Sequence, residues 1–128
     1  MLVQAKKRNP DIQLMGLVYS WPSWINTTGH DPFATAETNS RAAEYVTTWV
    51  AGAQAAHNLT IDWVGLWNEQ NYTPDYILTL RGALDEAGHA AVKIVGSDRW
   101  WDPIAQDYLA NASMRSAIGA LSEHYPNW

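Results

Sequence analysis

The chain has 128 residues, which is enough for one ordinary domain but short for two. Its net charge of −5 at pH 7 and its isoelectric point near 5.1 argue against a nucleic-acid partner, because phosphate binding needs clustered lysine and arginine side chains. Charged residues make up 16% of the chain, below the usual ~25%, although 47% is apolar and eight residues are tryptophan. Such a chain either buries much of its surface or forms part of a larger protein.

Few features of the sequence indicate a cellular compartment. There is no cysteine, so thiols cannot report the redox environment. No apolar stretch is long enough to cross a bilayer, and the opening residues lack the layout of a signal peptide. Acceptor sequons for N-glycosylation begin at Asn26, Asn58, Asn71 and Asn111. These sequons mildly favour a lysosomal or secreted protein.

The first half of the chain predicts a helix end, a strand, a long loop and a helix. Residues 1–10 have the basic last turn and the Asn-Pro stop of a helix end. An apolar strand is expected from Ile12 to about Tyr19. Residues 22–39 are rich in Pro, Gly, Asn and Thr, and loops of this length tend to be functional. Apolar residues at helical spacing then predict a helix over 40–57, with Ala42, Val46, Trp49, Val50 and Ala53 on its buried face.

The second half continues the alternation of strands and helices. A strand is expected at about Thr60–Trp67, followed by a helix that begins with the cap Thr73 and Pro74 and stops at Gly88. Its apolar stripe is Ile77, Leu80, Leu84 and Ala87. Two further strands are expected over 91–98 and 117–125, with a helix between them that starts at Asp102-Pro103.

Apolar strands separated by amphipathic helices predict an α/β fold with a parallel sheet covered on both faces. Two architectures fit this order: an open doubly wound sheet, or part of an eight-stranded (β/α)8 TIM barrel. The open sheet usually binds a nucleotide through a glycine-rich turn after one strand, and none of these strand ends has such a turn. The sequence therefore favours a partial barrel.

Polar and aromatic residues gather at the carboxyl ends of all four predicted strands. The four ends read YSWPSW, WNEQNY, SDRWW and EHYPNW. In barrel enzymes, this face holds the active site and receives residues from several strands. The sequence therefore predicts a pocket at this edge.

Four residues at these ends are candidates for chemistry. Glu69 follows a continuous apolar strand and stands among aromatic residues, so catalysis is favoured over a solvated carboxylate. Asn68 suits a sugar hydroxyl better than a simple turn. Asp98 is equally consistent with a helix cap and a functional role. His124, among aromatic residues, is favoured as functional.

The aromatic residues divide into two predicted groups. Trp49 and Trp63 are expected to pack in the interior. The others are expected at loop mouths, where rings stack on sugars: Tyr19, Trp21, Trp24, Trp100, Trp101 and Trp128. No Ser-His-Asp arrangement, metal-ligand spacing or phosphate loop is present in the sequence, so neither a metal nor a cofactor is expected.

Several motifs together are similar to glycoside hydrolase family 59, the galactosylceramidase family. WNE resembles the acid/base motif of the larger clan of retaining barrel glycosidases. The wider resemblance covers essentially the whole chain and rests on AKKRNPDIQLMGL, WPSW, TTWVAGA, IDWVGLWNEQNY, VKIVGSD and HYP. It implies that residues 1–128 are a single fragment of a TIM-barrel catalytic domain, carrying about its third to sixth strands.

The resemblance also implies roles for individual residues. Glu69 matches the general acid/base, and Asn68 the residue that holds the sugar 2-hydroxyl. Tyr19 falls where the family is expected to place a tryptophan. The implied substrate-binding residues are Asn68, Tyr19, Trp21, Trp67, Tyr72, His124 and Tyr125. The implied nucleophile is a glutamate after the seventh strand, outside this chain.

The implied activity is that of a retaining β-galactosidase acting on galactosylceramide-type sphingolipids, without a cofactor. Retaining hydrolysis needs two carboxyl groups roughly 5 Å apart, so the chain alone is expected to be inactive. The expected partner is a glycosphingolipid, and presentation by a lipid-binding activator protein stays open. Two alternatives also stay open: a glucosylceramidase- or xylosidase-like enzyme of the same clan, or a non-catalytic carbohydrate-binding remnant.

Overall fold

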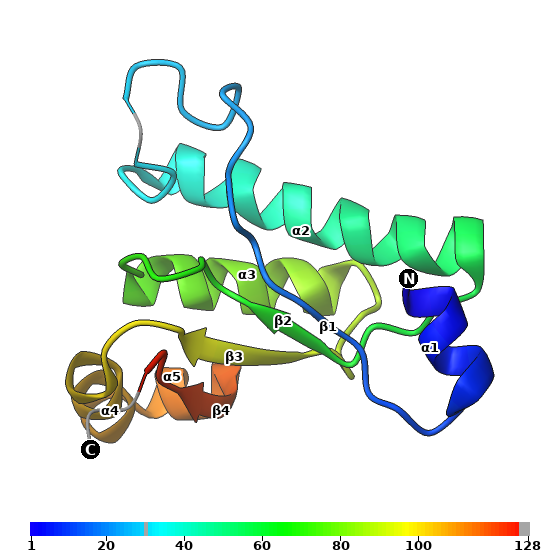
Figure 1. The fold of residues 1–128 in the computed structure, drawn as a ribbon. Helices are drawn as coiled ribbons and strands as arrows, with labels where there is room; N and C mark the ends of the chain where they lie inside the picture. Colours follow the sequence, from blue (N-terminus) through cyan, green and yellow to red (C-terminus); the bar gives the residue numbers. More distant parts are fainter. Residues whose placement is uncertain (30, 126–128) are drawn as a thin grey trace.

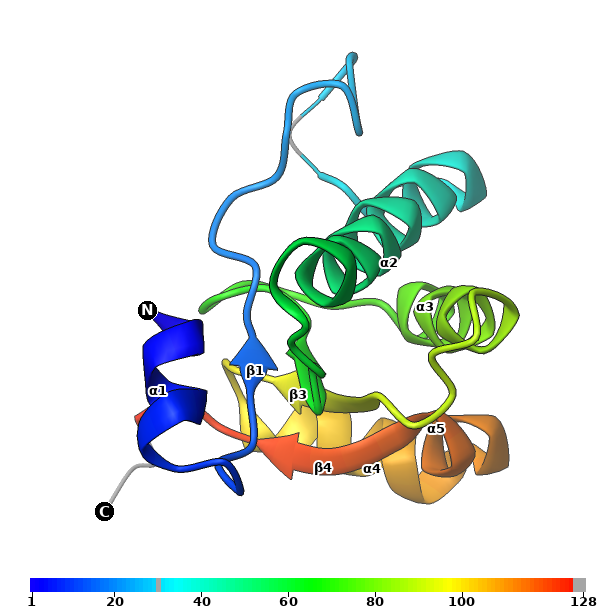
Figure 2. The same cartoon turned by 90° about the vertical axis from the view of Figure 1, so that its right-hand side faces the viewer.

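The computed structural model describes residues 1–29 and 31–125, which form a four-stranded parallel sheet with helices between the strands (Figures 1 and 2). The predicted loop-mouth residue Trp128 lies outside the described residues. The elements, in chain order, are α1 (Leu2–Arg8), β1 (Met15–Gly16), α2 (Ala36–His57), β2 (Trp63–Gly65), α3 (Pro74–Glu86), β3 (Lys93–Ser97), α4 (Trp101–Ala110), α5 (Ala112–Ala117) and β4 (Ile118–Ser122).

The strands lie in the order β1-β2-β3-β4, and every neighbouring pair is parallel. Trp63 of β2 pairs with Met15 of β1 and with Lys93 of β3, and the β3–β4 register shifts between Ile94 and Val95. The predicted α/β fold is confirmed. A doubly wound sheet reverses its strand order at a switch point, whereas the four described strands follow one direction, as neighbouring strands of a barrel do.

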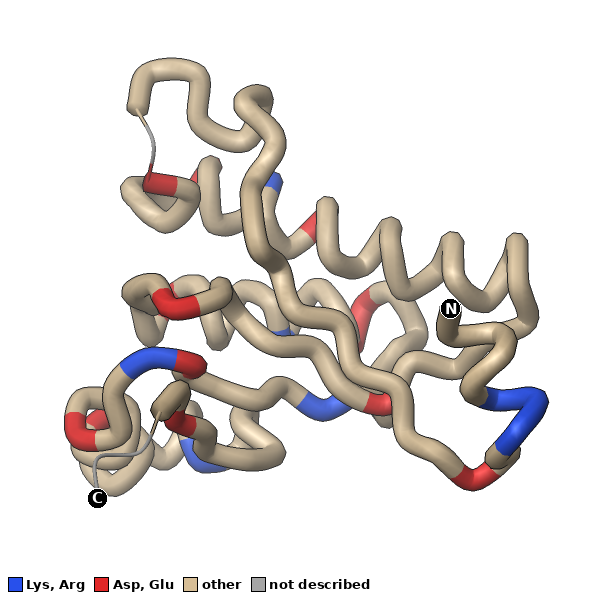
Figure 3. Tube along the Cα trace, viewed as in Figure 1, with Lys and Arg blue, Asp and Glu red and all other residues tan. Residues whose placement is uncertain are grey.

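The charged residues are spread thinly over the fold (Figure 3). The basic turn predicted at the start of the chain is the last turn of α1, where Lys6, Lys7 and Arg8 lie. Cations in this position interact favourably with the negative end of the helix dipole. This explains the basic cluster without a binding partner.

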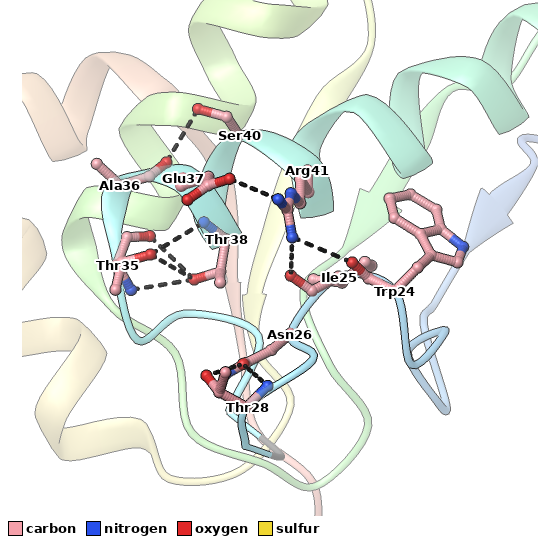
Figure 4. A network of polar contacts seen from close by, with 10 residues as sticks. All are labelled: Trp24, Ile25, Asn26, Thr28, Thr35, Ala36, Glu37, Thr38, Ser40 and Arg41. Carbon is pink, nitrogen blue, oxygen red and sulfur yellow. Dashed lines mark hydrogen bonds and ion pairs between the residues drawn. The ribbon is translucent and has the colours of Figure 1, made fainter.

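The long loop is shorter than predicted, because α2 begins at Ala36. Thr35 and Thr38 form a capping box: Thr35 Oγ1 accepts from the Thr38 N–H at 3.2 Å, and Thr38 Oγ1 accepts from the Thr35 N–H at 3.0 Å (Figure 4). Arg41 donates to the carbonyl oxygens of Trp24 and Ile25, which ties the loop to the helix. The usual capping box has Glu or Gln in the place of Thr38, so a threonine at this position is only a weak signal of a helix start.

A short helix, α5, is absent from the sequence prediction. Asn111 caps it: the side-chain Oδ1 accepts from the Ser113 N–H at 2.8 Å and from the Met114 N–H at 3.4 Å. The predicted strand over 117–125 therefore begins one residue later and is shorter, at Ile118–Ser122. Six residues are too few for a visible apolar period, and asparagine suits a cap as well as a loop.

The two longest helices pack side by side next to the strands (Figures 1 and 2). Three members of the predicted α3 stripe are fully buried, whereas Ala87 is exposed because the helix ends at Glu86. Thr73 caps α3 as predicted, and Gly88 adopts a φ of 79° just beyond its end. The buried face of α2 includes Ala42, Val46, Val50 and Ala53.

The two tryptophans expected in the interior are only partly covered. Trp49 stays 40% exposed, although its ring lies so close to Gly16 that a Cβ there would be 2.5 Å from a ring carbon. Trp63 is half-buried; its Nε1 donates to Oε1 of Gln13 at 2.7 Å, and Nζ of Lys93 lies 4.8 Å from its ring centroid. The prediction that both rings pack in the interior is therefore wrong for Trp49, which is exposed, and only partly met by Trp63.

An aromatic cluster joins the long loop to α2, to α3 and to the segment after β2. The ring of Trp21 meets those of Phe33, Tyr45, Trp67 and Tyr76 edge-on, with centroids 5.7 to 6.4 Å apart. Phe33 and Tyr76 are stacked at 4.2 Å. Edge-on and offset pairs of this kind add to the stability gained from burial. The cluster therefore holds the long loop beside the end of β2.

Tyr76 generates a stability prediction. It is fully buried, and its hydroxyl has no hydrogen-bond partner within residues 1–29 and 31–125. Burial raises the pKa of the Tyr76 phenol above its ordinary range. A raised folded-state pKa means that its contribution to stability is present below the unfolded value of ~10 and is lost as the pH rises above it.

We expect Tyr76→Phe to leave the free energy of unfolding at pH 7 unchanged, or to raise it by about 1 kcal/mol, because it removes an unpaired buried hydroxyl. It should also lessen the fall in stability above pH ~10. Chemical denaturation of the 128-residue chain, or of a longer protein that contains it, measures both effects. Tyr19→Phe, at an exposed position, is the control. A clear loss of stability at pH 7 would show that the hydroxyl has a partner.

Candidate active site

Three loops that follow neighbouring strands bring polar groups together. Glu69 follows β2, Asp98 follows β3 directly, and His124 follows β4. Nδ1 of His124 lies 3.0 Å from Oε1 of Glu69. The Glu69 backbone N–H donates a hydrogen bond to Oδ2 of Asp98 at 3.2 Å. The structure thus brings together Glu69 and His124, which the sequence favoured as functional. It places Asp98 beside them, a residue for which a helix cap and a functional role were equally consistent with the sequence.

The contact between His124 and Glu69 has the separation of a hydrogen bond but not its angles, so we treat it as a close electrostatic contact. The Glu69 side chain is 49% exposed and that of His124 is 28% exposed. Glu69 is therefore open to a ligand on one side while an imidazole covers another.

The backbone at this edge is unusual. Glu69, Asp98 and Tyr125 have φ values of 54°, 75° and 56°, in the left-handed region that side chains other than glycine rarely adopt. Each such residue costs of order 1–3 kcal/mol, and these conformations cluster at functional sites. Three of them at the ends of three neighbouring strands support a functional role for this edge.

Asn68 combines a fixed backbone with a free side chain. Its backbone N–H donates to the carbonyl oxygen of Val18 at 2.8 Å, which joins the segment after β2 to the one after β1. Its side chain is half-buried, and among the hydrogen bonds of residues 1–29 and 31–125 none involves its amide. The amide therefore keeps its donors and acceptor for a ligand.

The predicted sugar-stacking residues differ in exposure. Tyr19 is 73% exposed, and its carbonyl oxygen accepts from Nε1 of Trp67 at 3.4 Å. Trp21, by contrast, is enclosed by the aromatic cluster, and its Nε1 is buried without a partner among the described residues. Tyr125 is exposed, and its ring meets that of His124 edge-on at 4.0 Å. The other exposed predicted residues are Trp24, Trp100 and Trp101.

Tyr72 is joined to α4 as well as to its own loop. Its hydroxyl donates to Oδ2 of Asp107 at 2.6 Å. Burial, followed by the hydrogen bond and the charge of Asp107, raises the pKa of Tyr72. Beside this bond lies a surface cavity of about 260 Å³ whose lining includes Tyr72, Arg99 and Trp100. A larger cavity of about 690 Å³ opens within the long loop between Trp21 and Pro32 and contains none of the three polar groups described above.

Asp98 is the residue whose role the sequence left undecided. The helix-cap interpretation is wrong, because Trp100 is the N-cap residue of α4 and the Asp98 carboxylate accepts from Glu69 instead. The signal in the sequence was its place directly after an apolar strand. Its partner could not be found that way, because the two residues are 29 positions apart.

The described residues contain no group of three or more His, Cys, Asp or Glu side chains placed to hold a metal ion. None of the helices in this part of the chain is both long enough and apolar enough to span a bilayer.

Comparison with known proteins decides the family. The sequence model of glycosyl hydrolase family 59 matches residues 1–128. The chain belongs to glycosyl hydrolase family 59. This family 59 chain is 39% identical to the galactocerebrosidase of Canis lupus familiaris and 38% identical to that of Homo sapiens, each over 126 residues. These residues are 98% of the chain but 18% of each relative, so the chain spans less than a fifth of their length.

A solved structure supports the fold of this family 59 chain. The crystal structure of SrfJ from Salmonella typhimurium superposes with a TM-score of 0.77 at 17% sequence identity. The match covers 97% of this chain and 32% of SrfJ. At this identity, the likeness concerns the fold alone.

The bond between Tyr72 and Asp107 generates a second prediction. We expect Tyr72→Phe to lower the free energy of unfolding by about 1 kcal/mol at pH 7, because it leaves the partly buried Asp107 carboxylate without its donor. Urea denaturation of the 128-residue chain, or of a longer protein that contains it, measures the loss. Tyr108→Phe, at the residue next to Asp107 in α4, is the matched control and should change the free energy of unfolding little. Equal stabilities for the two variants would contradict the prediction.

Proposed function

We propose that this family 59 chain is part of a longer retaining β-galactosidase that acts on galactosylceramide-type sphingolipids, with Glu69 as its general acid/base. The observation that carries the proposal is the position of Glu69: it follows the carboxyl end of β2, next to Asn68 in the chain, and lies 3.0 Å from the His124 imidazole. The galactocerebrosidase relatives supply the substrate class. The second carboxylate is expected from a strand beyond this chain, in a closed barrel.

In the first step, the nucleophilic carboxylate attacks the anomeric carbon while Glu69 donates its proton to the departing oxygen of the ceramide. The bond between carbon and leaving oxygen breaks, and Glu69 becomes a carboxylate. In the second step, Glu69 takes a proton from water, whose oxygen attacks the same carbon and releases the nucleophile. Glu69 therefore alternates between its neutral and charged forms during the two steps.

The neighbouring residues bind the sugar. The Asn68 amide hydrogen-bonds to the 2-hydroxyl, an interaction that strengthens in the transition state. Tyr19 and Trp67 present rings to the apolar face of the galactose, and His124 and Tyr125 border the pocket. Trp21 supports Trp67 through the aromatic cluster, and Tyr72 holds the loop after β2 against α4.

The remaining parts of the proposal concern partners and compartment. The substrate is a glycosphingolipid, and a lipid-binding activator protein would present it to the enzyme. A lysosomal or secreted location agrees with the four sequons. No cofactor takes part.

Replacing the proposed acid/base gives the central test. In the complete enzyme, Glu69→Gln should reduce turnover of galactosylceramide by about 10²–10⁴-fold, because the ceramide alkoxide leaves only with a proton. An aryl galactoside with an acidic phenol should still form the covalent intermediate. Deglycosylation then limits the rate, and azide, which needs no general base, should accelerate it and yield a β-galactosyl azide. Equal losses on both substrates, with no response to azide, would remove Glu69 from this role.

Substrate preference separates the proposal from its relatives in the clan. We expect a higher kcat/KM for the galactoside than for the matching glucoside, measured with the same aglycone on the complete enzyme. The reason is that the rings near Asn68 would stack on the apolar face of galactose, which differs from that of glucose at one hydroxyl. A preference for the glucoside would favour a glucosylceramidase-like enzyme instead.

A further inference from the structure

The turn that carries Glu69 has a sequence that does not suit it. The Gln70 N–H donates to the Trp67 carbonyl oxygen at 3.4 Å, which closes a four-residue turn with Glu69 in its third position. At that position φ is 54°, and turns with a positive φ there favour glycine or asparagine. Glutamate has no local reason to adopt this conformation. A contact from elsewhere must hold it.

Asp98 makes that contact. Its Oδ2 accepts the backbone N–H of Glu69 at 3.2 Å, and this N–H is not used within the turn. A charged acceptor makes a stronger hydrogen bond than a neutral one. Asp98 forms no ion pair with any cation in the described part of the chain, so its carboxylate is not already engaged by a Lys or Arg side chain.

Asp98 itself stands on an ordered support. The neighbouring Ser97, at the end of β3, is 1% exposed, and its hydroxyl donates to the Trp100 carbonyl oxygen at 3.1 Å and accepts from the Arg99 N–H at 3.3 Å. These two bonds hold the backbone of residues 97–100, which includes Asp98, in a fixed turn. Its carboxylate is therefore presented from a strand end rather than from a free loop.

We propose that Asp98 is a positioning residue for the reaction: by holding the Glu69 N–H, it fixes the turn that aims the Glu69 carboxyl at the leaving oxygen. The inference rests on the proposed acid/base role of Glu69. It goes beyond that role because it makes the aim of the proton donor depend on a second residue, which directly follows the neighbouring strand β3. Asp98 itself does not touch the reacting atoms.

The test uses leaving groups of different basicity in the complete enzyme. An alkyl galactoside needs protonation of its leaving oxygen, whereas a dinitrophenyl galactoside does not. Asp98→Ala should lower kcat/KM for the alkyl galactoside by about 10²-fold, the usual effect of misplacing a catalytic group by about 1 Å. The loss for the dinitrophenyl galactoside should be several-fold at most. A merely structural role would lower both by the same factor.

Two further variants separate position from charge. Asp98→Asn keeps an oxygen acceptor without the charge and should retain most of the alkyl activity. Asp98→Glu keeps the charge but moves the acceptor by one methylene, and it should lose alkyl activity selectively. The opposite pattern would overturn the positioning role. These two variants also carry the test if Asp98→Ala does not fold.

Arg99→Met is the matched control. Arg99 links the same two loops, through a 2.6 Å hydrogen bond from Nη1 to Oδ1 of Asn71, without contacting Glu69. Its loss should leave the ratio of alkyl to dinitrophenyl activity unchanged. If Arg99→Met shifts this ratio as much as Asp98→Ala, general loosening of the loops explains the effect and the inference is wrong.

A double variant distinguishes failure of the positioning role of Asp98 from failure of the acid/base role of Glu69. Adding Asp98→Ala to Glu69→Gln should cause no further loss on the alkyl galactoside, because both changes remove the same proton donation. If Glu69→Gln is selective but Asp98→Ala is not, the inference fails and the acid/base role stands. If Glu69→Gln is not selective either, both fail.

Discussion

The parallel pairing of β2 with β3, and of β3 with β4, is the constraint on which the candidate site depends. Parallel strands all end at one edge, so residues far apart in the chain are delivered to one place. The buried residues that set this pairing, among them Val64 and Ile94, are directly opposite each other in the register. Slipping the pairing by one residue would turn such side chains to the opposite face, away from the core. The site is therefore as stable as the sheet beneath it.

Contacts from several neighbouring segments restrain Asn68 and Glu69, the two central residues of the candidate site. The Asn68 N–H is bound to the segment after β1, and Trp67 before it is packed in the aromatic cluster. The Glu69 backbone N–H is bound by Asp98, which directly follows β3, and the Glu69 carboxyl lies beside His124, which follows β4. Restraint by several rigid elements is what a catalytic constellation requires. The aromatic residues near the site thus serve the packing of the fold and the site at once.

Local chemistry decided which features could be predicted from the sequence. Apolar spacing and turn residues within a few positions predict the alternation of strands and helices and the Thr73 cap. The same local pattern marks Glu69 as a carboxylate that follows a buried strand. The start of α2 and the helix α5 were missed, because a threonine box and six residues give weak signals. The enclosure of Trp21 and the partner of Asp98 arise from contacts between distant segments. Such contacts exist only once the fold has formed.

At position 69, the residue that best fits the left-handed backbone is not the residue that provides the carboxylate of the candidate site. Glycine adopts this region without penalty, so a glycine at position 69 would suit the turn better than the residue that is there. Selection for stability alone would therefore drive the carboxylate out of the site. A consensus or stability-guided redesign would mark position 69 as a defect to be repaired, and the repaired protein would gain stability while losing the carboxylate proposed here as the proton donor.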